Sequence, residues 1–308
     1  MERVNHMVTE FILVGFTQDP MMQLVLFVLF LVVYSVTVVG NITLIIFICT
    51  DSRLHTPMYF FIGNLSFLDL CYSSVYTPNN IGNCVSEDKS ISFAGCLAQF
   101  FSAGLGYSEC YLLTAMAYDR YMAISNPLLY AQAMSSRVCV GLVTALYLGG
   151  FIHSTIITSE TFTLTFCADN VIDDFFCDLP PLVKLVCDVK ANYHIVLYFL
   201  LASNVLMPIV FILTSYLFII AAILRIRSTQ GQLKAFSTCS SHLIFVTLYC
   251  GSILYIYYRP SSSYSFEQDK IVSLFYTVVF PMLNPMIYIL RNTDVKEALR
   301  KLFNMMIS

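Results

Sequence analysis

Long apolar stretches recur along this chain of 308 residues, and they constrain its fold more than any other feature. A helix needs about 20 mostly apolar residues to cross the hydrocarbon core of a bilayer. Charged residues make up only 11% of the chain, whereas a soluble domain carries about 25%. We therefore expect a single all-α membrane domain, residues 1–308, built from seven transmembrane helices. The candidate spans are residues 23–49, 58–83, 96–121, 139–159, 192–224, 236–258 and 270–290.

The segments between the spans carry unequal charge. If the N-terminus lies outside, the inner segments hold ten Lys and Arg residues and the outer segments hold six. Basic residues in short loops set the orientation of a membrane protein, so this asymmetry favours an outer N-terminus. Residues 1–22 are then extracellular, residues 160–190 form an extracellular loop that covers the bundle as a lid, and residues 291–308 form a cytoplasmic tail.

Both ends of the chain carry further signals. The first 22 residues have no long apolar core, unlike a cleaved signal peptide, so we expect the first span to act as its own insertion signal. After Arg291, apolar residues recur at helical spacing beside basic ones, which predicts a short amphipathic helix in the plane of the membrane surface. The apolar positions are Val295, Ala298, Leu299, Leu302 and Phe303.

Four of the eleven cysteines fall in or beside the outer segments. Cysteine is often only a small buried hydrophobe, but several acidic residues lie close to these four in the sequence. Disulfides persist in the extracellular compartment, so we expect two bridges here. Four cysteines allow three pairings, and the residues alone leave the choice open. The four are Cys96, Cys167, Cys177 and Cys187.

The third span ends in a charged pair at the predicted cytoplasmic side. Residues 116–130 read MAYDRYMAISNPLLY, which places Asp119 and Arg120 between tyrosines. Charges at the edge of the hydrocarbon are costly unless they are paired or wetted, and tyrosine is typical of a membrane–water boundary. Other spans carry LHTPMYFF at 54–61, LSFLDLC at 65–71, KAFSTCSSH at 234–242 and PMLNPMIY at 281–288. With these motifs in this order, the chain closely resembles the odorant receptors, a branch of the rhodopsin-like G-protein-coupled receptors.

The resemblance covers nearly the whole chain. It implies a seven-helix bundle in the plasma membrane that binds a small, mostly apolar odorant in its outer half. It also implies activation of a heterotrimeric stimulatory, olfactory-type G protein, which raises cyclic AMP. Neither enzymatic activity nor a nucleic-acid partner is expected. A rhodopsin-like receptor for a non-odorant small metabolite would show the same sequence features, so that alternative stays open.

Two other classes of membrane protein fit less well. A transporter or channel should show several ionisable residues inside the membrane and often two similar halves. This chain has two mid-membrane acids and no internal repeat. An intramembrane enzyme would need acid–base or metal partners for His153 or His242, and we find none nearby in the sequence.

The resemblance assigns a G-protein switch to polar residues near the cytoplasmic side. Arg120 is held at rest by its neighbouring acid or by another inner partner, and it faces the G protein when the sixth span swings outward. Arginine suits this role because its guanidinium is always charged and presents a planar fork of donors. Pro285 removes a backbone donor and kinks the seventh span. The switch residues are Asp119, Arg120, Tyr121, Tyr216, Asn284, Pro285 and Tyr288.

Asp69 and Glu109 are the only acids placed mid-membrane. A buried carboxylate is costly unless it is partnered or protonated. The resemblance places their two spans side by side, so the acids share either a proton or a bound cation. We predict a sodium ion held by Asp69 and Glu109, together with Asn284. A neutral, hydrogen-bonded pair is the alternative.

By position, the resemblance also implies a ligand pocket in the outer half. None of its members is charged, which suits small ligands of modest polarity. Tyr107, Asn204 and Tyr257 are candidates for a hydrogen bond to the ligand, although each is equally compatible with an internal partner. The predicted wall comprises Ser102, Ala103, Gly106, Tyr107, Leu179, Leu200, Leu201, Asn204, Cys250, Ile253, Tyr257 and Thr277.

The resemblance further implies Cys96–Cys177 and Cys167–Cys187 bridges, the first of which would roof the pocket. Cys96 lies 24 positions before Arg120, and rhodopsin-like receptors usually show one more. A missing residue would rotate the upper third span by about 100°. The assignments of Ser102 and Ala103 therefore depend on whether the helix corrects this rotation.

Overall fold

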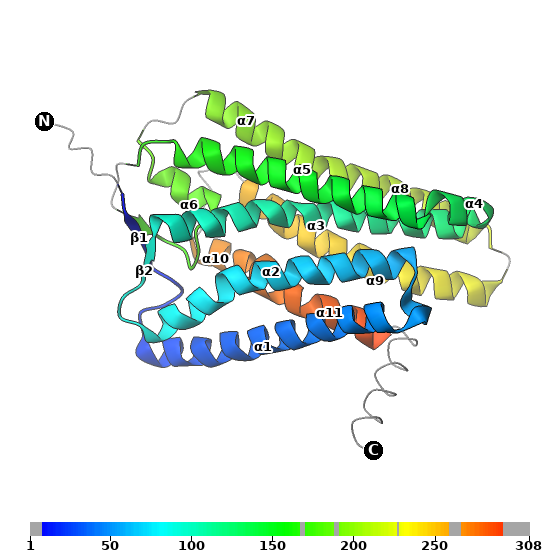
Figure 1. Cartoon of the computed structure of the whole chain (residues 1–308), viewed down its shortest axis with the longest axis horizontal. Coiled ribbons are helices and arrows are strands. Elements are labelled where there is room, and N and C mark those ends of the chain that lie inside the picture. Colours follow the sequence, from blue (N-terminus) through cyan, green and yellow to red (C-terminus); the bar gives the residue numbers. More distant parts are fainter. Residues whose placement is uncertain (1–7, 167–169, 188–190, 227, 259–265, 292–308) are drawn as a thin grey trace, which may run out of the picture.

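The computed structural model describes residues 8–166, 170–187, 191–226, 228–258 and 266–291. Within these residues the chain folds into a bundle of seven helical rods that lie side by side (Figure 1). The predicted seven-helix fold is confirmed, and each rod extends beyond its predicted span at one or both ends. The rods are α1 (Pro20–Thr50), α2 (Pro57–Val85), α3 (Phe93–Ser125), α5 (Ser136–Phe162), α7 (Ala191–Leu201) with α8 (Met207–Leu224), α9 (Thr229–Tyr257), and α10 (Phe266–Leu274) with α11 (Phe280–Arg291).

The outer surface of the bundle is apolar, as a lipid-facing surface must be. On α1, Leu24, Val32 and Val39 are each more than half exposed. Among the described residues, four helical stretches are long and apolar enough to cross a membrane by length and composition, at Pro20–Thr50, Ser136–Phe162, Asn192–Leu224 and Gln268–Tyr288. The helices α2 and α3 are equally long but more polar, because they bury acids and amides inside the bundle. The predicted amphipathic helix after Arg291 lies outside the described residues.

The chain marks its helix starts with residues that suit the first turn. Proline stands at the first position of α1, of α2 and of the short α4 (Pro127–Ala133), where its missing N–H breaks no hydrogen bond. Asp19 accepts a hydrogen bond from Met21 N (3.1 Å), and Ser92 accepts one from Gly95 N (3.1 Å). These caps lie outside the most apolar stretches, so the helices begin before the hydropathy rises.

The helix α3 runs through the centre and packs against α2, α5 and α8. Its contact with α5 is close because small residues face one another. A Cβ added to Gly104 would lie 2.9 Å from Ser154 Cα, and one added to Gly150 would overlap Ser108 Oγ. Small residues at helix crossings let membrane helices approach at backbone distance.

In the part of the chain that the structure describes, two rods contain a wider, π-helical turn. One, Ala202–Leu206, joins α7 to α8, and the other, Phe275–Val279, joins α10 to α11. Such turns displace side chains from the regular helical register and are frequent at functional sites. They carry the buried polar residues Asn204, Tyr276 and Thr277 in the outer half of the bundle.

A small sheet and a short helix cover the extracellular end, at the left of Figure 1. Strand β1 (Glu10–Leu13) pairs antiparallel with β2 (Ser90–Ser92) and parallel with β3 (Val171–Ile172). Helix α6 (Leu179–Lys184) follows in the same long loop. The N-terminal segment thus joins two extracellular loops into one cover over α3.

The predicted Cys96–Cys177 disulfide is present, with the two Cα atoms 5.4 Å apart. It ties the loop that contains β3 and α6 to the first turn of α3. Both cysteines are buried among Phe11, Phe100 and neighbouring apolar side chains. Cys167 lies outside the described residues, so the Cys167–Cys187 bridge stays a prediction.

Candidate functional site

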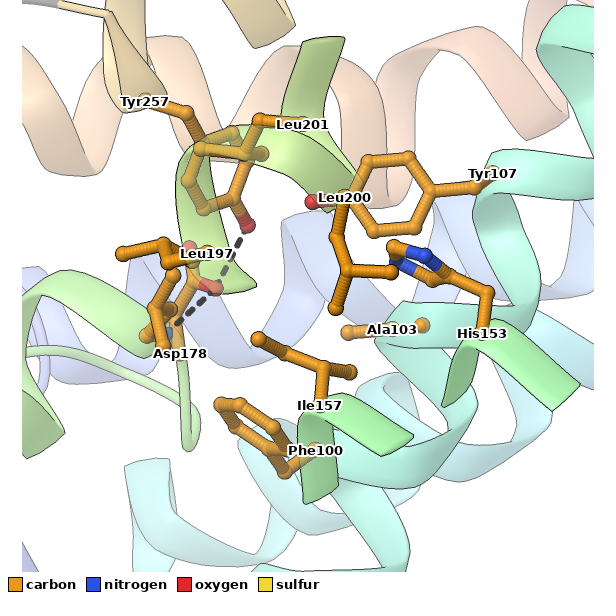
Figure 2. Close-up of a pocket in the computed structure, with 12 residues that line it drawn as sticks. Phe100, Ala103, Tyr107, His153, Ile157, Asp178, Leu197, Leu200, Leu201 and Tyr257 are labelled. Carbon is orange, nitrogen blue, oxygen red and sulfur yellow. Dashed lines mark hydrogen bonds between the residues drawn. The ribbon is translucent and has the colours of Figure 1, made fainter. Parts of the chain in front are cut away.

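An outer cavity lies where α3, α5, the lid, α7 and α9 meet (Figure 2). Its volume is about 20 Å³, and a single water needs roughly 10–15 Å³ on the same scale. The apolar side chains of its wall therefore close around almost no free space. The wall comprises Phe100, Ala103, Gly104, Tyr107, His153, Ile157, Asp178, Leu179, Leu197, Leu200, Leu201 and Tyr257.

Half of the predicted pocket residues line this cavity, namely Ala103, Tyr107, Leu179, Leu200, Leu201 and Tyr257. The other six lie elsewhere. Gly106 packs against the Tyr72 ring, and Thr277 donates a hydrogen bond to Ser273 O (2.7 Å) within its own helix. Ala103 belongs to the wall and Ser102 does not, because adjacent helical residues differ by about 100° in direction. The six residues outside the wall are Ser102, Gly106, Asn204, Cys250, Ile253 and Thr277.

The wall contains one carboxyl group, although the pocket predicted from sequence had no ionisable acid. Asp178 accepts hydrogen bonds from Tyr257 Oη (2.6 Å), Tyr276 Oη (2.8 Å) and the backbone N–H of Leu179 (2.7 Å). Figure 2 shows Tyr257 and Asp178 meeting at one side of the cavity. Burial raises the pKa of Asp178 above its ordinary value, and these three hydrogen bonds oppose that rise. The adjacent Cys177, bridged to α3, was the signal in the sequence that could have placed Asp178 here.

A second polar group in the wall comes from α5. The ring of His153 lies against the Tyr107 ring in a T-shaped contact, with centroids 4.6 Å apart. Asn204 Nδ2 lies 2.7 Å from His153 Nδ1 and also donates to Leu200 O at 2.7 Å. Asn204, a predicted ligand contact, thus has internal partners. Sequence reasoning considered His153 only as a catalytic residue and missed it as a wall residue.

The mid-membrane acids lie together below this cavity. Asn284 Nδ2 donates to Asp69 Oδ2 (2.8 Å), and Glu109 is close enough to interact electrostatically with Asp69. Asp69 Oδ1, Ser73 Oγ and Asn284 Oδ1 are buried and have no hydrogen-bond partner among the described residues. The side chain of Glu109 also contacts Tyr249 of α9.

An inner cavity lies at the other end of α3, where Asp119 and Arg120 stand. Its volume is about 350 Å³. Asp119 accepts a hydrogen bond from Tyr130 Oη of α4 (2.8 Å), and Arg120 contacts the Cys239 side chain of α9. The cavity is lined by Met58, Asp119, Arg120, Ala123, Ile124, Gly231, Ala235 and Cys239.

The remaining predicted switch residues do not line this cavity, and one of them, Asn284, lies beside Asp69. Tyr216 Oη lies 2.6 Å from His242 Nδ1 and donates to Cys239 O (3.3 Å), so it links α8 to α9. The Tyr121 ring packs beside Phe218 of α8, with centroids 5.9 Å apart. Pro285 of α11 lies against Gly40 of α1, and Tyr288 interacts electrostatically with Arg120.

Comparison with known proteins places this architecture in one family. The family model described as olfactory receptor matches residues 30–305. Olfactory receptor 9G19 of Mus musculus is 73% identical, and the match covers 98% of this chain and 99% of that receptor. Olfactory receptor 9G1 of Homo sapiens is 72% identical with the same coverage.

Solved structures agree on the fold. The crystal structure of squid rhodopsin superposes with a TM-score of 0.71 at 17% identity, and the match covers 94% of this chain and 87% of that one. Olfactory receptors are multi-pass proteins of the plasma membrane that act as signalling receptors and not as enzymes. With a family match over most of its length and relatives above 70% identity, the chain belongs to the olfactory receptor family.

Proposed function

We propose that this receptor binds a small, mostly apolar odorant in the outer cavity and activates a stimulatory G protein at the inner cavity, which raises cyclic AMP. One observation carries the proposal. The two cavities lie at opposite ends of α3, one enclosed by apolar side chains and the other beside Arg120. A ligand at one end and a protein partner at the other would then share one helix.

Ligand binding requires the outer cavity to expand. A volume of about 20 Å³ is too small for an organic molecule, so side chains such as Leu179, Leu197 and Leu200 must change rotamer. An odorant that prefers the expanded arrangement shifts the population toward it. Its differential affinity for the two arrangements limits the size of that shift.

Helix α9 offers the route by which this shift reaches the G protein. Its outer end carries Tyr257 at the ligand cavity, and its inner end carries Cys239 beside Arg120. A displacement of Tyr257 by the ligand would move one end of a helix whose other end borders the inner cavity. Binding of the G protein would thereby be favoured, although the G protein makes no direct contact with the odorant.

A cyclic AMP reporter assay in cells, run with an odorant panel, tests the proposal. Odorants should raise cyclic AMP in cells that display the receptor, and Arg120→Ala should remove the response. The matched control is Arg137→Ala, which changes an exposed arginine at the same end of the molecule. Surface display is measured with an antibody against an N-terminal tag. A response that survives Arg120→Ala, or none from well-displayed receptor, contradicts the proposal.

We also propose that a sodium ion occupies the site of Asp69, Glu109 and Asn284. Orphaned buried oxygens on Asp69, Ser73 and Asn284 support this proposal, because hard cations prefer oxygen ligands. Replacement of sodium by choline should change odorant potency in the wild type and not in Asp69→Asn. Identical odorant potency in sodium and in choline would contradict the sodium site and favour a neutral, hydrogen-bonded pair of Asp69 and Glu109.

A further inference from the structure

The hydrogen-bond pattern beside the outer cavity fixes the orientation of the Asn204 side chain. The Leu200 carbonyl oxygen accepts hydrogen bonds and cannot donate them, and it lies 2.7 Å from one terminal atom of that amide. That atom must therefore be the nitrogen, Nδ2. The same nitrogen lies 2.7 Å from Nδ1 of His153 and 3.1 Å from Ser203 Oγ, which itself donates to Leu200 O (3.0 Å). Because the amide nitrogen has two hydrogens, it donates along its two shortest contacts, to Leu200 O and to His153 Nδ1. Asn204 thus presents an N–H donor to the imidazole.

The orientation of Asn204 determines where His153 carries its proton. A donor from Asn204 requires Nδ1 to be an acceptor, which excludes the doubly protonated imidazolium. A neutral imidazole with an acceptor at Nδ1 has its N–H at Nε2. His153 is 4% exposed, and its Nε2 has no hydrogen-bond partner in the part of the chain that the structure describes. The wall therefore contains a buried donor that lacks an acceptor.

The rest of the wall does not supply that acceptor. Most of its members are hydrocarbon side chains, and the one carboxylate, Asp178, already receives three hydrogen bonds from Tyr257, Tyr276 and Leu179. The contact with Tyr107 orients the imidazole but offers it only the ring, because the arrangement is T-shaped. In Figure 2 the His153 ring lies beside Tyr107, across the cavity from Asp178.

We infer that the Nε2–H of His153 is the donor that anchors the ligand, and that the ligand class is small neutral molecules with one accessible oxygen acceptor, such as aldehydes, ketones and esters. The inference rests on the proposed odorant-binding function of the outer cavity. A ligand carbonyl oxygen satisfies a buried N–H that otherwise stays unpaired, so it gains affinity that a hydrocarbon of the same shape lacks. Carboxylic acids are disfavoured, because their ionised form would enter a wall that contains Asp178.

A matched ligand series tests this specificity. Cells that display the receptor are exposed to five compounds at each of several straight-chain lengths, with cyclic AMP as the readout. The five are the aldehyde, the methyl ketone, the primary alcohol, the carboxylic acid and the alkane. The aldehyde and ketone should exceed the alkane and the acid in potency by about tenfold, the value of one good hydrogen bond. His153→Phe keeps an aromatic ring against Tyr107 and removes the donor. It should lower the potency of the carbonyl compounds about tenfold and leave the alkane unchanged.

Two results would overturn the inference. One is an alkane as potent as its ketone on the wild type, and the other is a His153→Phe effect of equal size on every member of the series. Asn204→Leu provides a second variant that leaves the imidazole in place but frees its tautomer. It should weaken the carbonyl preference less than His153→Phe does.

A spectroscopic measurement tests the predicted tautomer of His153 independently of any cyclic AMP response. Purified receptor labelled with ¹⁵N-histidine is placed in lipid nanodiscs, and the signal that is missing from His153→Phe is assigned to His153. That signal should be that of a neutral imidazole protonated at Nε2. Protonation at Nδ1 would contradict the inference. If no compound activates well-displayed wild-type receptor, the proposed function fails, whereas the tautomer still reports on His153.

Discussion

The two ends of the bundle differ in how much space they enclose. The outer cavity has a volume of about 20 Å³ under a cover made of the sheet, the lid and the Cys96–Cys177 disulfide. The inner cavity has about 350 Å³ and is bordered by α2, α3 and α9 at the end where the loops are short. A small odorant must therefore open its own site, whereas a protein partner meets a site with space already present.

This contrast follows from how each end is held together. The outer end is fixed by a covalent bond, a three-stranded sheet and buried hydrogen bonds to Asp178. The inner end relies on single contacts between helices, such as Tyr130 with Asp119 and Tyr216 with His242. Changes at the outer end should therefore affect folding, and changes at the inner end should affect signalling.

Loss of the disulfide should have the largest effect. Cys96→Ser removes a bridge across 81 residues, and removal of a native disulfide typically costs about 2–5 kcal/mol. We expect a large fall in the unfolding temperature of purified receptor and in its surface display. Cys84→Ser is the matched control, because Cys84 is a free cysteine at the same end of the molecule. Equal behaviour of the two variants would mean that the cover does not depend on this bond.

The close contact between α3 and α5 should give the next largest effect. In Gly104→Ala the new Cβ would lie 2.9 Å from the backbone of Ser154, so the helices must separate. Overpacking of this kind costs about 1–3 kcal/mol. Gly149→Ala is the control, because a Cβ there meets nothing within 4 Å and alanine favours the helix by up to about 1 kcal/mol. Thermal unfolding should shift in opposite directions in the two variants.

Acid conditions should stabilise the outer cover. Burial raises the pKa of Asp178 and, more strongly, that of Asp174, whose neighbour Asp178 adds to the rise. Both groups bind protons more readily when folded, so the stability they contribute is present below about pH 3.9, the unfolded value, and is lost as the pH rises through the folded values. The third acid of this stretch, Asp173, is paired with Lys270, whose Nζ lies 2.6 Å from Asp173 Oδ1.

The measurement is the unfolding temperature as a function of pH. It should fall from acid toward neutral pH in the wild type, and Asp174→Asn should flatten the curve. Asp88→Asn is the control, because Asp88 is exposed and its pKa is lowered by a hydrogen bond from Ser90. A rising curve, or an equal slope in Asp174→Asn, would contradict the assignment.

The fold was predictable because apolar length alone limits a chain in lipid to a few architectures. The residues at which the helices begin and end were less predictable from the sequence. Polar caps such as Asp19 and Ser92 begin helices outside the apolar stretch, where hydropathy gives no signal. The disulfide Cys96–Cys177 followed from the family resemblance, and the residues alone left its pairing open.

The outer site was predictable only in part. Among the predicted positions, Ala103 of α3 and Leu200 of α7 line the cavity. Tyr107 and Tyr257 also line it, whereas Asn204 and Thr277 do not. The direction of these last two side chains depends on which helices face one another and on the π-helical turns that carry them. His153 is the only histidine in its span, and its burial beside Asn204 is a tertiary feature that periodicity does not encode.

Tyr130→Phe should have the smallest effect, confined to signalling. It removes one hydrogen bond to Asp119 while it keeps the ring, and a bond of this kind contributes about 0.5–1.5 kcal/mol. The bond ties α4 to α3 in the arrangement described here, so its loss favours any arrangement without it. Basal cyclic AMP per displayed receptor should rise by up to roughly tenfold, with the unfolding temperature almost unchanged. The control is Tyr118→Phe, which alters an exposed tyrosine that directly precedes Asp119 on α3. A large fall in the unfolding temperature of Tyr130→Phe would instead show that the inner end is held as firmly as the outer one.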